Sequence, residues 1–474
     1  MNSPIGIESV RSMVVGLDEC VPVADGAMRP YVNCDNAAST PTLRPVAAAV
    51  DEFLRWYSNV HRGTGFKSRL SSWAFEEARA VIARFVGAED RSNVVIFCRN
   101  ATEGINRLAH RYPFRPDGIV LTSVMEHHSN ELPWRRVAHV VHVGLTPDGR
   151  LDLADLEAKL VEHEGRVQLV ALTGASNVTG WVNPVHDIAR LAHAHGAEVM
   201  IDGAQLVPHR PVTMKPDGHP EHLDYLVFSG HKMYAPYGVG VLVGPRATFL
   251  RGDPDLVGGG AVDIVTLEDA YWTDLPDKEE AGTPDIVGAV AVARAIRLLE
   301  AVGWDAIIAH EQALTARALQ RLTATAGVTI YGCSDPRRLI DRLGVIAFNV
   351  AGLPHALVAA ILGYEHGIGV RAGCFCAHPY VKNLLHVDAV AAQALEDRIR
   401  RRDRSDIPGA VRISFGIYNS VEEVDAVCDA VARIARGEHR TEYVLNVERG
   451  EYTLPGADAA LDRFFTIDLP AAAP

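Results

Sequence analysis

Short apolar runs alternate with amphipathic stretches through much of this chain. The runs at residues 93–97, 118–123 and 167–172 are rich in β-branched and aromatic side chains, which is typical of buried parallel strands. In the stretch at 186–195, apolar side chains recur at the spacing of an amphipathic helix. This alternation predicts β-α-β units and an α/β fold with a mostly parallel central sheet.

A second region follows the alternating one. Residues 287–302 have a helical pattern, and apolar runs at 343–349 and 411–415 predict further strands. We therefore expect a smaller α/β domain at the C-terminal side of the large one. The predicted divisions are an N-terminal arm at 1–34, a large domain at 35–290, a small domain at 291–440 and a C-terminal extension at 441–474.

Composition narrows the class of protein. The chain has 474 residues, enough for a large core, and its formal net charge of −13 argues against nucleic acid as a partner. No stretch approaches about eighteen consecutive apolar residues, and the first residues lack the pattern of an export signal. The seven scattered cysteines suit reduced thiols. We expect a cytoplasmic protein with no membrane partner.

Two further apolar runs end at polar residues that suit one cofactor chemistry. The run at 199–201 ends at Asp202, and the run at 223–228 continues into a Ser-Gly-His-Lys sequence that closes at Lys232. The carboxyl ends of parallel strands gather ligand groups. A lysine amine holds the aldehyde of pyridoxal phosphate covalently, and a carboxylate keeps the pyridine nitrogen protonated. We therefore predict a pyridoxal phosphate site with Lys232 and Asp202 in these roles, although a lone strand-end lysine is usually a solvated charge.

Other polar side chains near these strand ends are expected to complete the site. Gln205 is placed to donate to the phenolic oxygen of the cofactor ring, and Ser229 and His231 are near enough to reach the phosphate. Asn177 follows the strand at 167–172 and is placed to contact the substrate or the ring oxygen. Arg412, in a predicted strand of the small domain, suits bidentate binding of a substrate carboxylate, with a surface arginine as the alternative.

The phosphate is expected at a helix start. A turn after the strand at 93–97 leads into a helix that begins near Ala101, with Thr102 at a favourable capping position. Free backbone amides and the positive end of the helix dipole bind phosphate well. An ordinary capped helix without a ligand is the alternative.

Two adjacent histidines, His127 and His128, follow the strand at 118–123. One imidazole is placed to stack on the cofactor ring, with simple surface exposure as the alternative. Adjacent histidines point to different sides of an extended chain, and no further His or Cys pair at ligand spacing lies nearby. We therefore expect no metal site.

The stretch at 371–379 holds two thiols, Cys374 and Cys376, in a glycine-flanked segment that is expected to be a loop. In extended backbone both thiols would face one way. His378 raises the alternative of zinc, but a fourth ligand is not evident. Inert buried thiols are a second alternative. Arg371 favours a nucleophilic thiolate, which would attack the sulfur of a bound amino acid.

These motifs together resemble enzymes of the class V aminotransferase fold, specifically the SufS-like group of cysteine desulfurases and selenocysteine lyases. The resemblance runs from about residue 32 to about residue 436 and is specific in eight ordered stretches. The matching stretches are 35–39, 61–63, 101–106, 126–130, 202–205, 229–232, 280–284 and 418–420.

The resemblance implies fold type I of the pyridoxal phosphate enzymes, with a large domain, a smaller C-terminal domain and a homodimeric assembly. It implies that Lys232 bonds the cofactor, that His127 stacks on it, that Cys376 carries sulfur as a persulfide, and that Arg412 binds the substrate carboxylate. His61, in one of the matching stretches, is expected in the substrate site. The cofactor-binding set that follows is Ala101, Thr102, His127, Asn177, Asp202, Gln205, Ser229, His231, Lys232 and Thr283, with Thr283 reaching the partner subunit's phosphate.

Three departures from the family pattern bear on the substrate. The loop has Gly-Cys-Phe-Cys at 373–376, which looks like molybdenum cofactor sulfurases; the segment between Cys376 and Arg412 is long; and residues are appended at the C-terminus. We predict an enzyme that converts L-cysteine to L-alanine and a Cys376 persulfide, with a sulfur-acceptor protein as a possible partner. The alternative is a class V C–S lyase or aminotransferase-like enzyme acting on a larger thio-substituted amino acid. The sequence leaves open whether Cys374 or Cys376 reacts.

Overall fold

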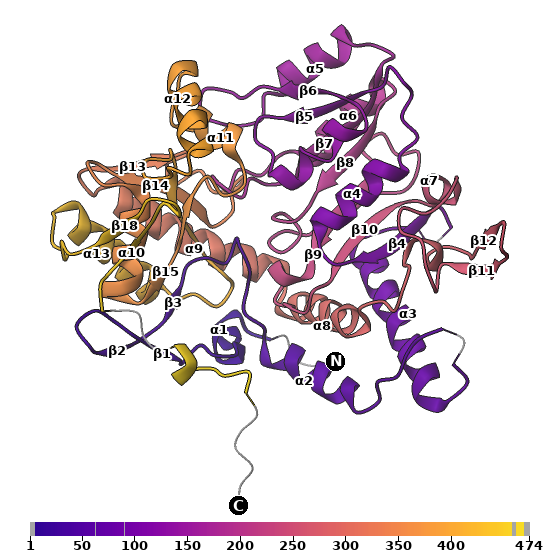
Figure 1. The fold of residues 1–474 in the computed structure, drawn as a ribbon, viewed down its shortest axis with the longest axis horizontal. Helices are drawn as coiled ribbons and strands as arrows, with labels where there is room; N and C mark the ends of the chain where they lie inside the picture. The colour runs from indigo at the N-terminus through magenta and orange to yellow at the C-terminus, as the bar shows by residue number, and fades with distance from the viewer. Residues whose placement is uncertain (1–4, 62, 90, 457–460, 469–474) are drawn as a thin grey trace, which may run out of the picture.

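The computed structural model describes residues 5–61, 63–89, 91–456 and 461–468. Within them, the larger lobe is built on a seven-stranded sheet (Figure 1). All neighbouring strands in it are parallel except β10, which runs antiparallel to both of its neighbours. The order across the sheet is β4 (Asn93–Cys98), β10 (Gly240–Pro245), β9 (Tyr225–Ser229), β8 (Glu198–Asp202), β7 (Val167–Thr173), β5 (Ile119–Ser123) and β6 (His139–Val143).

Helices cover both faces of this sheet, and alternate strand residues pack against each side. On β8, Val199 and Ile201 join the core beneath α3, α5, α6 and α8, whereas Met200 joins a second core beneath α4. The helices of this lobe are α2 (Arg44–Leu54), α3 (Phe66–Val86), α4 (Ala101–Arg111), α5 (Leu153–Glu162), α6 (Val185–Ala194), α7 (Arg246–Leu250) and α8 (Ile286–Val302).

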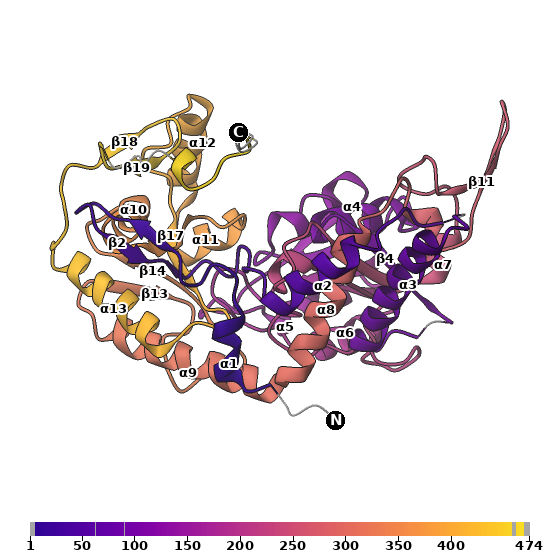
Figure 2. The ribbon, with the colours of Figure 1, turned by 90° about the horizontal axis from the view of Figure 1, so that it is seen from below.

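In the described part of the chain, the smaller lobe is built on a four-stranded antiparallel sheet in the order β13 (Val328–Tyr331), β14 (Val345–Val350), β17 (Ala410–Ser414) and β16 (Arg371–Gly373). Figure 2 shows the two lobes side by side, with α8 and α9 running in succession along one side of them. The helices of this lobe are α9 (Trp304–Thr323), α10 (His355–His366), α11 (His378–Leu384), α12 (Ala389–Arg400) and α13 (Val421–Ala435).

The chain ends add small elements to the smaller lobe. After the short helix α1 (Ile7–Val10), the hairpin of β1 (Cys20–Pro22) and β2 (Met28–Pro30) leads to β3 (Val32–Asn33), which pairs with β15 (Ile368–Gly369). The C-terminal extension forms the hairpin β18 (Val444–Asn446) and β19 (Glu451–Thr453).

A third hairpin, β11 (Val262–Val265) and β12 (Ala270–Trp272), projects from the larger lobe (Figure 2).

The predicted fold class is confirmed, and the expected strands and helices fall within a few residues of their observed bounds. The domain boundaries stay a prediction. No helix among the described residues is long and apolar enough to cross a membrane.

Candidate active site

A cavity of about 300 Å³ lies between the two lobes, at the carboxyl ends of β7, β8 and β9. Large-lobe residues form one side of it, among them Asp202, Ser229 and Lys232. The small lobe supplies Cys376 and Arg412. Residues that are distant in sequence thus converge where an α/β sheet collects its ligands.

Asp202 is buried and Lys232 is partly buried, and both side chains line this cavity. Lys232 closes a single turn of 3₁₀-helix directly after β9. Burial lowers the pKa of Lys232 to about 8, and the nearby Asp202 carboxylate opposes that change. Burial also raises the pKa of Asp202, against a hydrogen bond of 2.9 Å from the Ala204 backbone N–H. An amine with a lowered pKa is a good nucleophile at neutral pH, so the pair suits covalent capture of an aldehyde.

Hydroxyl groups and backbone amides gather at the start of α4. The Ala101 N–H donates to Ser229 Oγ (2.8 Å), and the hydroxyls of Thr102 and Ser129 are 2.7 Å apart. The predicted cap was wrong: Asn100 caps the helix, and its side chain accepts from the Glu103 N–H (3.0 Å). Thr102 is therefore free to turn its hydroxyl to the cavity, where a phosphate fits these donors.

A glycine makes room for this turn. Gly240 on β10 lies so close to the turn that a β-carbon there would collide with the Asn100 backbone. The start of α4 can reach its place over the strand ends only because residue 240 has no side chain.

His127 also lines the cavity, and its ring is held by Ser129. The Ser129 N–H donates to His127 Nδ1 (3.1 Å), so Nδ1 carries no proton. Burial, with a further contribution from Lys232, lowers the pKa of His127 to about 3. The ring is therefore neutral at pH 7, as suits stacking on a heterocycle.

Two further predicted site residues, Gln205 and His231, line the same cavity. The side-chain amide of Gln205 donates to the Ala37 carbonyl (2.6 Å).

Arg412 lies on β17 with only 3% of its surface exposed. Its Nη1 donates to the Asn177 carbonyl (2.9 Å) and its Nη2 pairs with Asp35 Oδ1 (2.9 Å). The other carboxylate oxygen of Asp35 pairs with Arg371 (2.6 Å). Buried Arg412 Nε has no hydrogen-bond partner among the described residues. A buried arginine with an unsatisfied N–H beside a cavity fits a carboxylate ligand.

Asn177 and Phe375 also contact Arg412, and they contact each other. The Arg412 guanidinium carbon lies 5.0 Å from the centre of the Phe375 ring, which is also buried. The Asn177 amide donates to the Phe375 carbonyl (2.7 Å). Asn177 lines the cavity, and its side-chain amide is hydrogen-bonded to the small lobe; its contact with the substrate or the ring oxygen stays a prediction.

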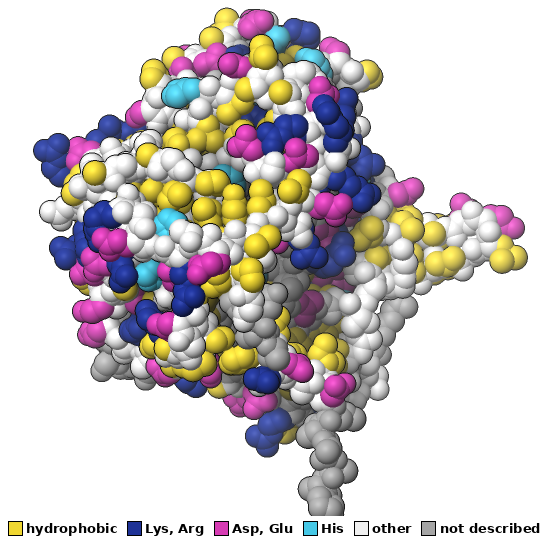
Figure 3. All heavy atoms as spheres, turned by 60° about the vertical axis from the view of Figure 1, so that its left-hand side comes forward, with side chains coloured by type: hydrophobic (Ala, Val, Ile, Leu, Met, Phe, Trp, Pro, Cys, Tyr) yellow, Lys and Arg dark blue, Asp and Glu magenta, His cyan; other side chains and the backbone are white. Residues whose placement is uncertain are grey.

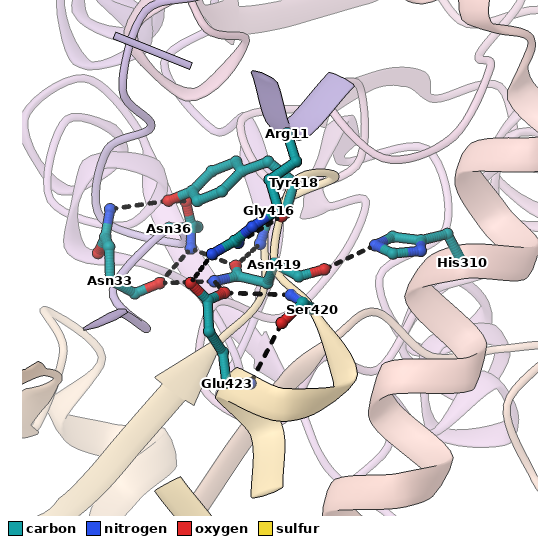
Figure 4. Close-up of polar contacts among 9 residues, drawn as sticks. All are labelled: Arg11, Asn33, Asn36, His310, Gly416, Tyr418, Asn419, Ser420 and Glu423. Carbon is teal, nitrogen blue, oxygen red and sulfur yellow. Dashed lines mark hydrogen bonds and ion pairs between the residues drawn. The ribbon is translucent and has the colours of Figure 1, made fainter. Parts of the chain in front are cut away.

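A polar network anchors the segment at residues 35–38, which carries Asp35 into this region (Figure 4). The Tyr418 hydroxyl donates to Asn36 Oδ1 (2.8 Å), and Asn36 is buried. From the N-terminal segment, Arg11 donates to the Tyr418 carbonyl (3.1 Å) and pairs with Glu423 (2.8 Å). The network joins the N-terminal segment to the start of α13, so the cavity wall is fixed from both ends of the sequence.

The two thiols have different surroundings. Cys376 is exposed and lines the cavity, whereas Cys374 is buried and its thiol donates to the Pro408 carbonyl (2.9 Å). Burial raises the pKa of Cys374 to about 11. Phe375 and Cys376 both have left-handed backbone conformations, with φ of 53° and 56°, so the segment is not extended and the condition under which both thiols would face one way is not met. The reactive candidate is Cys376.

His61 and Thr283 lie elsewhere in the chain. They line a second hollow of about 580 Å³ together with Asp277, whose carboxylate is 3.4 Å from His61 Nδ1. Arg62, which follows His61 in the motif at 61–63, lies outside the described residues. A single chain does not bring His61 and Thr283 to the cavity.

Sequence reasoning missed Ser129, Asp35 and the part played by Phe375. Ser129 and Asp35 stand inside the matching stretches 126–130 and 35–39, so their place was signalled but their contacts were not. Phe375 had no signal beyond its position between the two cysteines. Among the described residues, no group of three or more His, Cys, Asp or Glu side chains is arranged to hold a metal ion.

Comparisons with known proteins show which sequences and structures this chain is similar to. The aminotransferase class-V family model matches residues 32–427. A probable cysteine desulfurase of Halobacterium salinarum is 39% identical over 438 residues, which cover 90% of this chain and 96% of that protein. An apo structure of a cysteine desulfurase from Thermococcus onnurineus matches with a TM-score of 0.77 and 33% identity, covering 92% of this chain and all of that one. The cysteine desulfurase CsdA of Escherichia coli matches at 0.71 and 29%, covering 86% and 95%.

Proposed function

The chain belongs to the class V aminotransferase family, and from this premise we propose that it is a pyridoxal phosphate enzyme that removes sulfur from L-cysteine. The observation that carries the proposal is the convergence of Lys232, Asp202, Arg412 and Cys376 on one cavity. Removal of sulfur from cysteine requires each of these groups. The amine and the carboxylate hold the cofactor, the arginine binds the carboxylate of the substrate, and the thiol receives the sulfur of the substrate.

The large lobe would hold the cofactor. Lys232 Nζ would bond it, Asp202 would face its ring nitrogen, and His127 would cover the ring. The start of α4, with Ala101, Thr102, Ser229 and His231, would bind its phosphate. When bound, the cofactor supplies an electron sink for a substrate carbon. Lys232 Nζ, once free of the cofactor, would take the proton from the substrate Cα, which its lowered pKa suits.

Arg412 would bind the substrate carboxylate through Nε, which is otherwise unsatisfied, and Nη2. Asp35 now occupies Nη2 and also pairs with Arg371, so it can keep Arg371 as its partner when the substrate takes its place. Phe375 fills the space on the far side of the guanidinium. This packing supports a small amino acid as the substrate.

The Cys376 thiolate would attack the sulfur of the bound cysteine. A sulfur–sulfur bond forms, the carbon–sulfur bond breaks, and its electron pair stays with the substrate carbon, which takes a proton. The products are L-alanine and a persulfide on Cys376, so the step balances without an external oxidant. Removing the persulfide sulfur requires a thiol acceptor, and we propose an acceptor protein for that role.

We also propose a homodimer in which His61 and Thr283 serve the partner's cavity. Large apolar side chains are exposed on either side of His61 in the sequence, including Trp56 (41%) and Phe66 (62%). The hairpin of β11 and β12, with Leu267 fully exposed at its turn, stands away from the body as an arm with hydrophobic side chains along it (Figure 3). These surfaces suit burial against a second copy.

The assembly can be tested by mixing two inactive variants. Lys232→Ala lacks the amine, and Thr283→Asp places a negative charge where the phosphate of the partner's cavity is expected. Co-refolded chains would form mixed dimers with one complete cavity, so about a quarter of the wild-type activity should return. No recovery, with mixed dimers present by mass, would refute a shared site.

Location in the cytoplasm is part of the proposal. All seven cysteines lie within the described residues and are free thiols, as suits a reducing compartment.

The activity is tested by supplying L-cysteine and pyridoxal phosphate to the purified chain, then quantifying alanine and protein-bound sulfane sulfur. We expect stoichiometric sulfane sulfur on Cys376 and about equal alanine in the first turnover. Cys376→Ala should abolish both, and Lys232→Ala should remain colourless with the cofactor. Undiminished alanine from Cys376→Ala would overturn the sulfur step.

A further inference from the structure

The backbone that presents Cys376 is unusual. Phe375 and Cys376 are successive non-glycine residues with left-handed φ, a conformation that persists only where surrounding contacts impose it. One such contact is the hydrogen bond from the Asn177 amide to the Phe375 carbonyl (2.7 Å). The conformation of the Cys376 residue itself therefore calls for a second support.

His128 contacts Cys376 itself and His378, two residues further along the chain. Its backbone N–H donates to the Cys376 carbonyl (2.7 Å). Its ring Nε2 accepts from the backbone N–H of His378 (3.2 Å) and lies 3.0 Å from His378 Nδ1. The two rings are stacked, with centres 4.7 Å apart and planes at 23°. Because Nε2 accepts the backbone bond, it carries no proton, and His378 Nδ1 must be the donor in the ring-to-ring contact.

The ring contact also completes a helix start. Helix α11 begins at His378, and its N-cap residue Ala377 has no side chain that can accept a hydrogen bond. Pro379 has no N–H that needs an acceptor. His128 Nε2 therefore takes the place of a capping side chain and ties the start of α11, two residues after Cys376, to the large lobe.

We propose that His128 and His378 form a latch that positions the Cys376 thiol over the cavity for attack on the substrate sulfur. The proposal rests on the proposed function for the role of Cys376, and both histidines are positioning residues that act through it. With the latch closed, the thiol faces the cavity. Cys376 is exposed even in the closed state, but there its thiol lines the cavity. With the latch open, the strained segment relaxes and the thiol leaves the cavity wall, which opens more of it to reagents in solvent.

The test uses the purified full-length chain, incubated with pyridoxal phosphate, and measures alkylation of Cys376 by iodoacetamide with peptide mass spectrometry. The exposed thiol of Cys20 in the same molecule is the internal reference. Cys376 should be alkylated about three- to tenfold faster in His128→Ala and in His378→Ala. Each variant loses one or two partly exposed hydrogen bonds that keep the latch closed, and their free energy corresponds to a rate change of this size. The rate at Cys20 should not change.

Conservative variants separate the latch from a general loss of structure. The amide of Asn reproduces the Nδ1 donor of His378, and the amide oxygen of Gln reproduces the Nε2 acceptor of His128. We expect His378→Asn and His128→Gln to alkylate close to the wild-type rate. His386→Asn, an exposed histidine beyond the end of α11, is the matched control and should also behave as wild type.

Turnover gives a second readout. Because the latch acts after the substrate is bound, His378→Ala should lower kcat for alanine about three- to tenfold and leave KM unchanged. Equal alkylation rates in wild type and both alanine variants, or no rescue by His378→Asn, would overturn the latch. If the wild type makes no alanine from L-cysteine, the proposed function fails, while the order of alkylation rates still decides the latch.

Discussion

The lowered pKa of Lys232 gives a direct prediction about cofactor capture. The ordinary pKa of a lysine is 10.5, and burial brings that of Lys232 to about 8. A difference of about 2.5 units corresponds to about 3 kcal/mol that favours the neutral amine. At pH 7 roughly one Lys232 in ten is neutral, against roughly one in three thousand for an ordinary lysine, so the neutral amine that can capture the cofactor aldehyde is about 300-fold more abundant than at an exposed lysine.

The rate of colour formation on mixing cofactor-free protein with pyridoxal phosphate measures this directly. The lowered pKa means that the neutral fraction grows as pH rises and is nearly complete above the folded-state pKa. The rate should therefore increase about tenfold per pH unit from about pH 6 and level off near pH 8. Lys232→Ala, which has no amine to react, is the blank.

Asp202→Asn sharpens the test because the Asp202 carboxylate raises the pKa of Lys232. Without that charge the pKa should fall further, so the plateau should begin at lower pH even though the ring nitrogen has lost its partner. A rate that still climbs beyond about pH 9 in the wild type would refute the assignment of a desolvated amine. A plateau that moves to higher pH in Asp202→Asn would refute the charge coupling.

Three further outcomes follow from the contacts of buried groups. Asp35→Ala leaves buried Arg412 with an unpaired charge, so the free energy of unfolding should fall by about 3 kcal/mol in denaturant titrations; a change below about 1 kcal/mol would contradict this. Cys374→Ser should keep alanine formation within about twofold, because the hydroxyl can still donate to the Pro408 carbonyl; loss of all activity would show that the buried thiol reacts. Burial raises the pKa of Glu126 from 4.5 to about 8, so this carboxyl increasingly lowers the stability of the fold as pH rises through that range. Glu126→Gln should therefore gain stability relative to wild type between pH 4.5 and pH 8, by roughly 5 kcal/mol at most, and a constant difference would argue against the raised pKa.

Sequence reasoning located the cofactor side of the site well because its residues stand at strand ends. Asp202 and Lys232 each follow a short apolar run, and parallel strands bring such ends together whatever the connecting helices do. The start of α4 could be placed for the same reason. The predicted cap, Thr102, lies two residues after the observed cap, Asn100, because Asn and Thr are both good caps and only the backbone angles distinguish them.

The thiol side could not be predicted in the same way. Its geometry depends on two left-handed residues, Phe375 and Cys376, that local sequence does not favour. Their conformation is imposed by Asn177 and His128, which belong to the other lobe. A contact between lobes leaves no periodic signal in either segment, so the sequence identified two candidate thiols and the fold distinguished them.

The charge of the cavity lining is opposite in sign to the net charge of the chain. The protein has a formal net charge of −13, yet the described side chains that line the cavity include Lys232, Arg371 and Arg412 against one carboxylate, Asp202. The histidines there add little charge at neutral pH, because burial lowers the pKa of His127 to about 3 and that of His231 to about 4. A positive hollow in an acidic protein focuses the field on small anions, whereas extended polyanions meet a repulsive surface. A phosphorylated cofactor and an amino-acid carboxylate would both be drawn to the same place, where the Asp35 carboxylate bridges the two arginines.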